Sequence, residues 1–89
     1  MNQKSNDQRF FDEGLGEALQ IARKQAGLTQ EELARKLGLA AGTIQRYEYG
    51  TRRMSAYRLF KICKILPGLL LFFVLGATGP RPEEEEKQV

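Results

Sequence analysis

Gln45 and Arg46 are the side chains whose type and position best suit binding chemistry. The helical spacing of residues 41–49 places Ile44 and Tyr47 on one face and turns Gln45 and Arg46 elsewhere. Both carry paired hydrogen-bonding groups that can contact the edge of a nucleic-acid base. The sequence has no histidine, no glycine-rich phosphate loop and no nucleophile paired with a base. We therefore expect a binding protein rather than an enzyme, with no cofactor and no metal.

The segment that must position these side chains is residues 29–50, TQEELARKLGLAAGTIQRYEYG. Its first half places Leu33, Ala34 and Leu37 on one helical face, and residues 38–40 separate that half from the second helical pattern. Two short helices joined by a tight turn at this spacing form a helix-turn-helix pattern. The second helix of such a motif enters the DNA major groove.

Several residues of this segment have the sizes and functional groups that the motif needs. Thr29 and Glu32 form a T-x-x-E capping box, which marks the start of the first helix. Gly38 follows the last helical turn, where a residue with positive φ ends a helix at little cost. Ala34 is small where the second helix crosses, and Ile44 is expected to pack against the first helix. The alternative is an ordinary αα-hairpin within a helical bundle.

Composition limits the remaining possibilities. Eighty-nine residues suffice for one domain with a small core, and a single cysteine excludes an internal disulfide. The absence of histidine removes nearly all zinc sites. The polar N-terminus lacks the apolar run of a signal peptide, so we expect a cytoplasmic location and no membrane association.

The net charge of +3 is unevenly distributed. Residues 14–66 carry ten lysines and arginines against four glutamates, whereas residues 1–13 and 67–89 are each net acidic. A basic core favours a polyanionic partner, most simply the phosphate backbone of double-stranded DNA. A generically cationic domain is the alternative on charge alone.

The rest of the chain divides into an arm, further helices and a tail. We assign residues 1–11 to a flexible N-terminal arm and residues 12–76 to the DNA-binding domain. A first helix is expected to begin between Asp7 and Glu13 and to reach Ala26, although Gly14 and Gly16 weaken its first half and favour a later start. Helices are also expected near residues 30–37, 41–49 and 56–66. Residues 77–89 contain four consecutive glutamates and are predicted to be a disordered acidic tail.

Residues 69–75 form an apolar run without a polar face, too short to cross a bilayer. One side of a two-turn helix can cover the domain core, and the other side must then meet water or a partner. We predict a homodimer, with an interface formed by Leu69, Leu70, Phe72, Phe73 and Leu75. The alternative is that Pro67 and Gly68 let the segment fold back and fill the core of the monomer.

Residues 15–66 resemble the Cro/C1-type helix-turn-helix family, also called the XRE family, of phage and bacterial repressors. The resemblance rests on the stretches ARKQAGLTQEELARKLGL, TIQRYEYGTRR and LFKICKIL. It implies an all-α fold, a compact four- to five-helix bundle like the lambda-repressor DNA-binding domain. It also implies binding to operator DNA, usually as a dimer on a palindrome.

The resemblance also implies residue roles. The recognition helix is about residues 41–49, and its expected base-contacting positions are Ala41, Gly42, Thr43, Gln45 and Arg46. Phosphate contacts are expected from Gln30, Arg52 and Arg53, and an ion pair is expected between Arg23 and Glu48. Two positions depart from the family pattern. Ala40 stands where a Ser or Thr usually caps the recognition helix, and Ala41 and Gly42 replace side chains that often form hydrogen bonds.

These features predict a sequence-specific DNA-binding transcriptional regulator, a repressor, that reads operator DNA in the major groove. The alternative is a protein-interaction module, such as an antitoxin or a coactivator-like subunit, that binds a protein partner through residues 69–75. DNA binding and a protein partner are compatible with each other.

Overall fold

The computed structural model describes the backbone of residues 6–74 and the side chains of residues 6–71. This part of the chain contains five helices and no strand: α1 (Asn6–Gln25), α2 (Gln30–Leu37), α3 (Ala41–Tyr49), α4 (Ala56–Ile65) and α5 (Pro67–Val74). The predicted all-α bundle is confirmed. None of these helices is long and apolar enough to cross a membrane.

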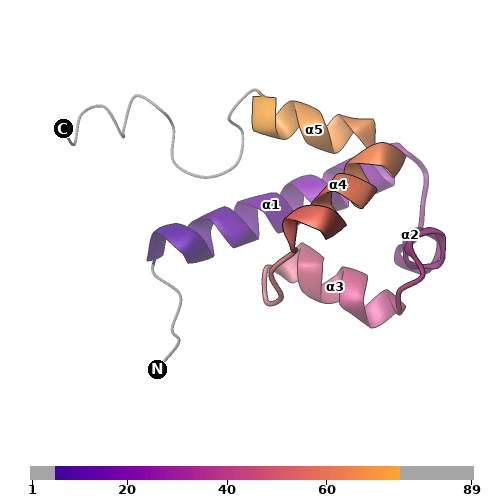
Figure 1. The fold of residues 1–89 in the computed structure, drawn as a ribbon, viewed down its shortest axis with the longest axis horizontal. Helices are drawn as coiled ribbons and strands as arrows, with labels where there is room; N and C mark the ends of the chain where they lie inside the picture. The colour runs from indigo at the N-terminus through magenta and orange to yellow at the C-terminus, as the bar shows by residue number, and fades with distance from the viewer. Residues whose placement is uncertain (1–5, 75–89) are drawn as a thin grey trace.

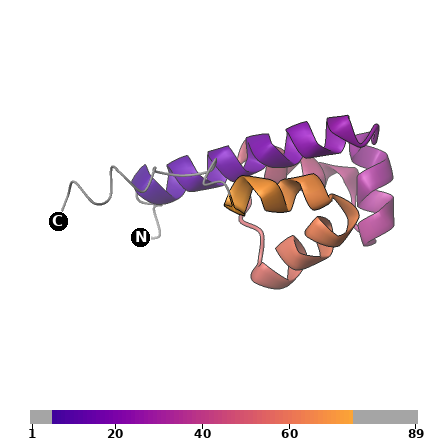
Figure 2. The ribbon, with the colours of Figure 1, turned by 90° about the horizontal axis from the view of Figure 1, so that it is seen from above.

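The long helix α1 is the element on which the bundle is built (Figure 1). Seen from above, α5 lies alongside α1, and α3 lies on the opposite side of the bundle (Figure 2). Helix α2 closes one end, and α4 packs against α5. All five helices contribute to one core, whose largest fully buried side chains are Leu19, Leu33, Ile44, Ile62, Leu66 and Leu69.

Helix α1 begins earlier than the sequence suggested. It starts at Asn6, so residues 6–11, which we assigned to the arm, are helical. Phe11 packs against the buried core, and Asp7 lies in the first turn, where a negative charge interacts favourably with the helix dipole. These interactions extend the helix through Gly14 and Gly16 despite their low helix propensity.

Gly16 is required by the approach of α3 rather than tolerated as a weak point of α1. A Cβ atom at this position would lie 2.4 Å from the Glu48 carbonyl oxygen and 2.5 Å from that of Tyr47. Both are backbone atoms, so a larger residue would push the two helices apart. The expectation that Gly16 favours a later helix start is therefore wrong, because tertiary packing overrides its propensity.

Helix α5 divides its apolar residues between the core and the surface. Leu69 is fully buried in the core of its own protomer, so its assignment to a dimer interface is wrong. Leu70 and Leu71 are 53% and 58% exposed. Phe72 and Phe73 belong to α5, but their side chains lie outside the described residues, as do Leu75 and the acidic tail.

Candidate nucleic-acid interface

The geometry of the α2–turn–α3 unit is set by one cap at each end of α2. Thr29 Oγ1 accepts a hydrogen bond from the Glu32 backbone N–H at 3.0 Å, and Glu32 Oε1 accepts one from the Thr29 N–H at 2.8 Å. These two bonds hold the pKa of Glu32 below its usual value. Gly38 ends the helix with φ +71°, and the following Leu39 N–H donates to the Ala34 carbonyl at 2.8 Å. The predicted capping box and glycine stop are confirmed.

Helix α3 is held by one face and exposes the other. Ile44, Tyr47 and Glu48 are buried, whereas Gln45 and Arg46 are exposed. The other three predicted base-contacting residues, Ala41, Gly42 and Thr43, are half-buried in the first turn. The exposed surface of α3 therefore combines two long polar side chains with a low-profile N-terminal turn that lets another molecule approach the backbone closely.

Arg46 and Gly42 share this surface. Side chains on a helix lean toward its N-terminus, so residue 46 covers the turn that contains residue 42. Arg46 Nη1 lies 4.0 Å from the point where a Cβ of Gly42 would sit. The guanidinium therefore lies along the first turn of α3, beside Gly42.

A buried polar cluster fastens α3 to α1 and α2. Arg23 donates from Nε to Glu48 Oε2 at 2.6 Å and from Nη2 to Glu48 Oε1 at 3.2 Å. Its Nη1 donates to the Leu28 carbonyl at 2.8 Å. Gln30 donates from Nε2 to Glu48 Oε1 at 2.9 Å. The side chains of Arg23 and Glu48 are only 8% and 2% exposed, so the predicted ion pair is present and almost fully desolvated.

The two ends of α3 differ in how their backbone groups are satisfied. At the N-terminus, Ala40 forms no side-chain cap, as expected from its sequence. At the C-terminus, the Arg46 carbonyl accepts hydrogen bonds from the Thr51 N–H at 3.0 Å and from the Thr51 hydroxyl at 3.2 Å. The loop that carries Arg52 and Arg53 is therefore tied directly to α3.

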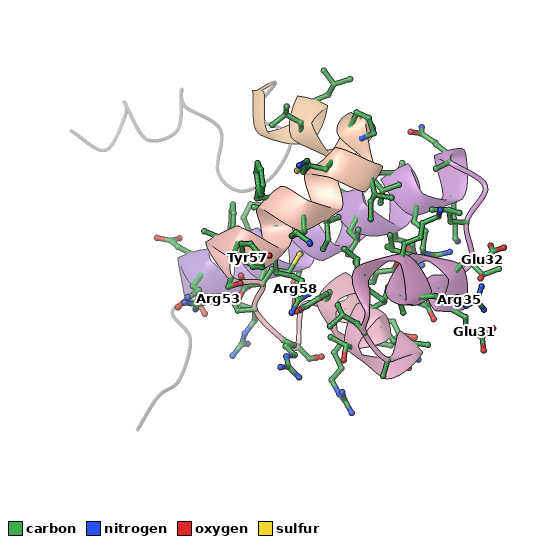
Figure 3. The ribbon with its side chains drawn as sticks, turned by 45° about the vertical axis from the view of Figure 1, so that its right-hand side comes forward. Glu31, Glu32, Arg35, Arg53, Tyr57 and Arg58 are labelled. Carbon is green, nitrogen blue, oxygen red and sulfur yellow. The ribbon has the colours of Figure 1, made fainter. Side chains whose placement is uncertain are left out.

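The loop arginines have different surroundings. Arg52 is exposed, whereas Arg53 Nε lies 3.9 Å from Oδ2 of the buried Asp12 on α1. Figure 3 shows Arg53 and Arg58 beside this loop, while Arg35 lies at the far end of the molecule next to Glu31 and Glu32. Arg58 was not among the residues predicted from sequence. The sequence did contain one indication of its position, since Arg58 follows the capping residue Ser55 by three residues and so lies in the first turn of α4.

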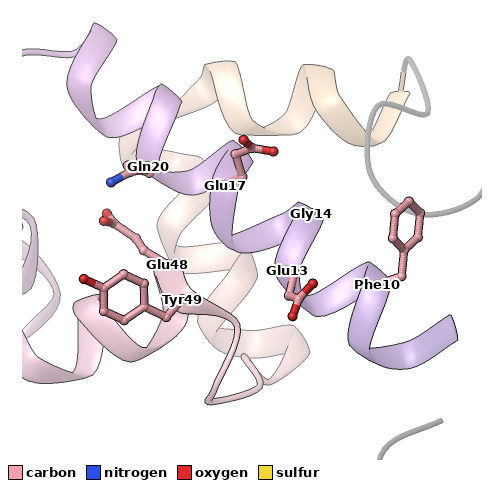
Figure 4. Close-up of a pocket in the computed structure, with 7 residues that line it drawn as sticks. All are labelled: Phe10, Glu13, Gly14, Glu17, Gln20, Glu48 and Tyr49. Atoms are coloured by element: carbon pink, nitrogen blue, oxygen red, sulfur yellow. The ribbon is translucent and has the colours of Figure 1, made fainter. Parts of the chain in front are cut away.

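An acidic hollow of about 490 Å³ lies between α1 and the end of α3 (Figure 4). Glu13 and Glu17 project from α1 on one side of it, and Tyr49 lies on the other side. Glu48 also lines the hollow, but its carboxylate is already bonded to Arg23. The carboxylates disfavour phosphate, so this surface lies outside the candidate interface.

Comparison with known proteins identifies the same unit. A family model described as helix-turn-helix matches residues 19–69. An uncharacterized HTH-type transcriptional regulator of Sinorhizobium medicae (strain WSM419) is 38% identical over 65 residues, covering 73% of this chain and 47% of that protein. The antitoxin HipB of Escherichia coli O6:H1 (strain CFT073) is 35% identical over 74 residues, covering 83% of this chain and 77% of HipB.

A solved structure shares the arrangement of helices. The crystal structure of the clp gene regulator ClgR from Corynebacterium glutamicum superposes with a TM-score of 0.63 at 29% identity, covering 68% of this chain and 84% of that one. The chain spans about half the length of the first curated relatives that it matches, with 47% of each covered. The family match covers more than half of this sequence and includes α2, the turn and α3. The chain therefore belongs to the Cro/C1-type, or XRE, helix-turn-helix family.

Proposed function

We propose that this chain is a sequence-specific DNA-binding transcriptional regulator that acts as a repressor. The observation that carries the proposal is the construction of α3: one face is locked to α1 and α2 through Glu48, and the other presents Gln45 and Arg46 to solvent. A helix fixed in this way can present its exposed donors to the major groove without a rearrangement of the fold. A cytoplasmic location follows from this role.

Base recognition is assigned mainly to Arg46. Its guanidinium can donate two hydrogen bonds to guanine O6 and N7, a contact worth about 1–3 kcal/mol of discrimination. Gln45 and Thr43 supply further polar contacts, while Ala41 and Gly42 allow methyl contact and close backbone approach. Because these last two side chains are small, part of the specificity is expected from DNA shape.

Phosphate contacts are assigned to Gln30, Arg52 and Arg53, with Arg58 added from the structure. The Gln30 amide uses one hydrogen for Glu48 and keeps a second for a phosphate oxygen. Arg52 is exposed and can contact a phosphate directly, whereas the guanidinium of Arg53 also lies near the Asp12 carboxylate. These contacts position the protein without reading sequence.

The test of this proposal is the binding specificity of Arg46→Ala. Sites are first selected from random duplex DNA with the wild-type chain, and all single-base variants of the selected site are then measured. We expect Arg46→Ala to lose preference at one base pair in each half-site. Lys24→Ala, an exposed change at the end of α1, is the matched control and should retain the wild-type preference. Unchanged preference in Arg46→Ala would refute the assignment.

We propose further that the chain binds DNA as a homodimer. A two-fold dimer places two recognition helices about 34 Å apart, one turn of DNA, and so matches a palindromic site. Leu70 and Leu71 of α5 support this proposal, because their apolar side chains are exposed to water and a second copy could bury them. Sedimentation equilibrium at micromolar concentrations measures the association.

A protein-interaction role is the second candidate, since HipB is named as an antitoxin and the similarity covers most of its length. The same exposed apolar surface would then receive another protein. The discriminating observation is the behaviour of the purified chain. A chain that stays soluble alone and binds DNA favours the first candidate, whereas one that precipitates unless a partner is co-expressed favours the second.

A further inference from the structure

An open apolar groove lies between α4 and α5. It encloses about 450 Å³ and is lined by Ala56, Leu59, Phe60, Cys63, Lys64 and Leu70. Burial raises the pKa of the Cys63 thiol, which fits the apolar lining. The groove therefore offers space for apolar side chains from outside the protomer.

Large apolar side chains of the two helices are also exposed. Phe60 and Leu70, which line the groove, are each more than half exposed, as are Tyr57 on α4 and Leu71 on α5. Large exposed apolar side chains beside a concavity are characteristic of a protein interface.

The charge on this surface has one sign. Helix α4 carries Arg58, Lys61 and Lys64, and neither α4 nor α5 contains an acidic residue. Lys61 Nζ lies 5.7 Å from the centre of the Tyr57 ring, and Lys64 Nζ lies 5.2 Å from that of Phe60. Both ammonium groups thus lie over aromatic rings of α4, and the Lys64–Phe60 pair lines the groove itself. A segment that binds here must therefore have apolar side chains that fill the groove and negatively charged side chains that pair with Lys61 and Lys64.

The chain itself contains a segment with these two properties in sequence. Residues 72–75 are Phe-Phe-Val-Leu, and residues 83–86 are four glutamates. The seven residues between them can span up to about 25 Å when extended. Helix α4, with ten residues, is about 15 Å long. A single copy of the segment can therefore supply both the apolar side chains and the carboxylates to one groove.

We propose that the α4–α5 groove of one protomer receives residues 72–75 of a second copy, and that residues 83–86 of that copy pair with Lys61 and Lys64. This contact requires the homodimer proposed above and assigns the residues that form its interface. The exchange is reciprocal, because a two-fold axis makes each copy both donor and acceptor. The glutamates thereby offset the repulsion between the cationic α4 helices of the two copies.

This arrangement predicts a dimer that salt weakens. Ion pairs on an exposed rim are screened as ionic strength rises, whereas apolar burial alone is not. We expect the dimer dissociation constant of the wild-type chain to increase when the NaCl concentration is raised from about 0.05 M to about 0.5 M.

The decisive experiment is a charge swap on the full chain, read by sedimentation equilibrium without DNA. The first variant carries Lys61→Glu and Lys64→Glu, and the second has lysine in place of each glutamate of residues 83–86. Each variant alone brings like charges together and should dimerise at least about tenfold more weakly than the wild type. An equimolar mixture restores opposite charges across both contacts and should form a heterodimer of near wild-type affinity.

Two controls accompany the swap. Arg35→Glu with Lys36→Glu produces the same change in net charge on the exposed face of α2 and should leave dimerisation unchanged. Phe60→Ala removes an exposed side chain from the groove and should weaken the dimer without reducing helical content by circular dichroism.

Three outcomes would overturn the proposal. If the mixed variants associate no better than either alone, the glutamates do not act across the dimer. If Phe60→Ala leaves the dissociation constant unchanged, the groove is not the contact surface. If the wild type remains monomeric at high micromolar concentration, the dimer itself is refuted, while base reading by α3 is still judged separately through Arg46.

Discussion

Gly16 provides a direct test of how closely α1 and α3 must approach. Replacement by alanine would place a Cβ atom 2.4 Å from the Glu48 carbonyl oxygen and 2.5 Å from that of Tyr47. Ordinary contacts of a Cβ atom begin at 3.4 Å, so the helices would have to separate by about an ångström. Neither oxygen can move away alone, because both belong to the backbone of α3.

The expected cost follows from two opposing effects. Overpacking of a tight contact costs about 1–3 kcal/mol or more, and the change from glycine to alanine in a helix returns about 0.5–1 kcal/mol. A net loss of about 1–2 kcal/mol lowers the melting temperature of a domain this small by roughly 4–16 °C. Separation of α1 and α3 also disturbs the hydrogen bonds between Arg23 and Glu48, so DNA affinity should fall with stability.

Thermal and urea unfolding followed by circular dichroism, at one fixed protein concentration, measures the effect. Gly68→Ala is the matched control, because a Cβ at that helical glycine would meet no atom within 4 Å and the residue has no positive φ. The control should be neutral or slightly stabilising. A Gly16→Ala variant as stable as the wild type would show that the helices do not depend on this contact.

Two further predictions concern charged side chains. Arg23→Met or Glu48→Leu alone should destabilise the fold by about 3–5 kcal/mol by leaving a buried charge, and the double variant should cost much less than their sum; a double-mutant cycle without coupling would contradict the pairing. Arg52→Ala should weaken binding to all DNA sequences alike and reduce the slope of log K against log salt by about one unit. Arg53→Ala should change that slope less, because its guanidinium faces Asp12; equal slopes for the two variants would argue against this difference.

Local signals determined the helix-turn-helix unit from sequence alone. Thr29 and Glu32 are three residues apart, Gly38 follows a periodic segment, and Ile44 and Tyr47 recur at helical spacing. Each signal acts within a few residues, through hydrogen bonds and backbone dihedral preferences that do not depend on the rest of the molecule. The boundaries of α2 and α3 were therefore predictable. The pairing of Arg23 with Glu48 was also predicted, although only through the family resemblance.

Tertiary packing decided what local signals could not. Gly16 has a low helix propensity in isolation, yet it lies mid-helix because α3 needs the space. Leu69 and Leu70 are adjacent and identical in type, but only Leu69 meets the core because α5 packs along α1 through one face. The positions of Arg53 beside Asp12 and of the apolar groove between α4 and α5 likewise depend on helices distant in sequence. Such contacts arise from the relative placement of whole helices, which no short stretch of residues encodes.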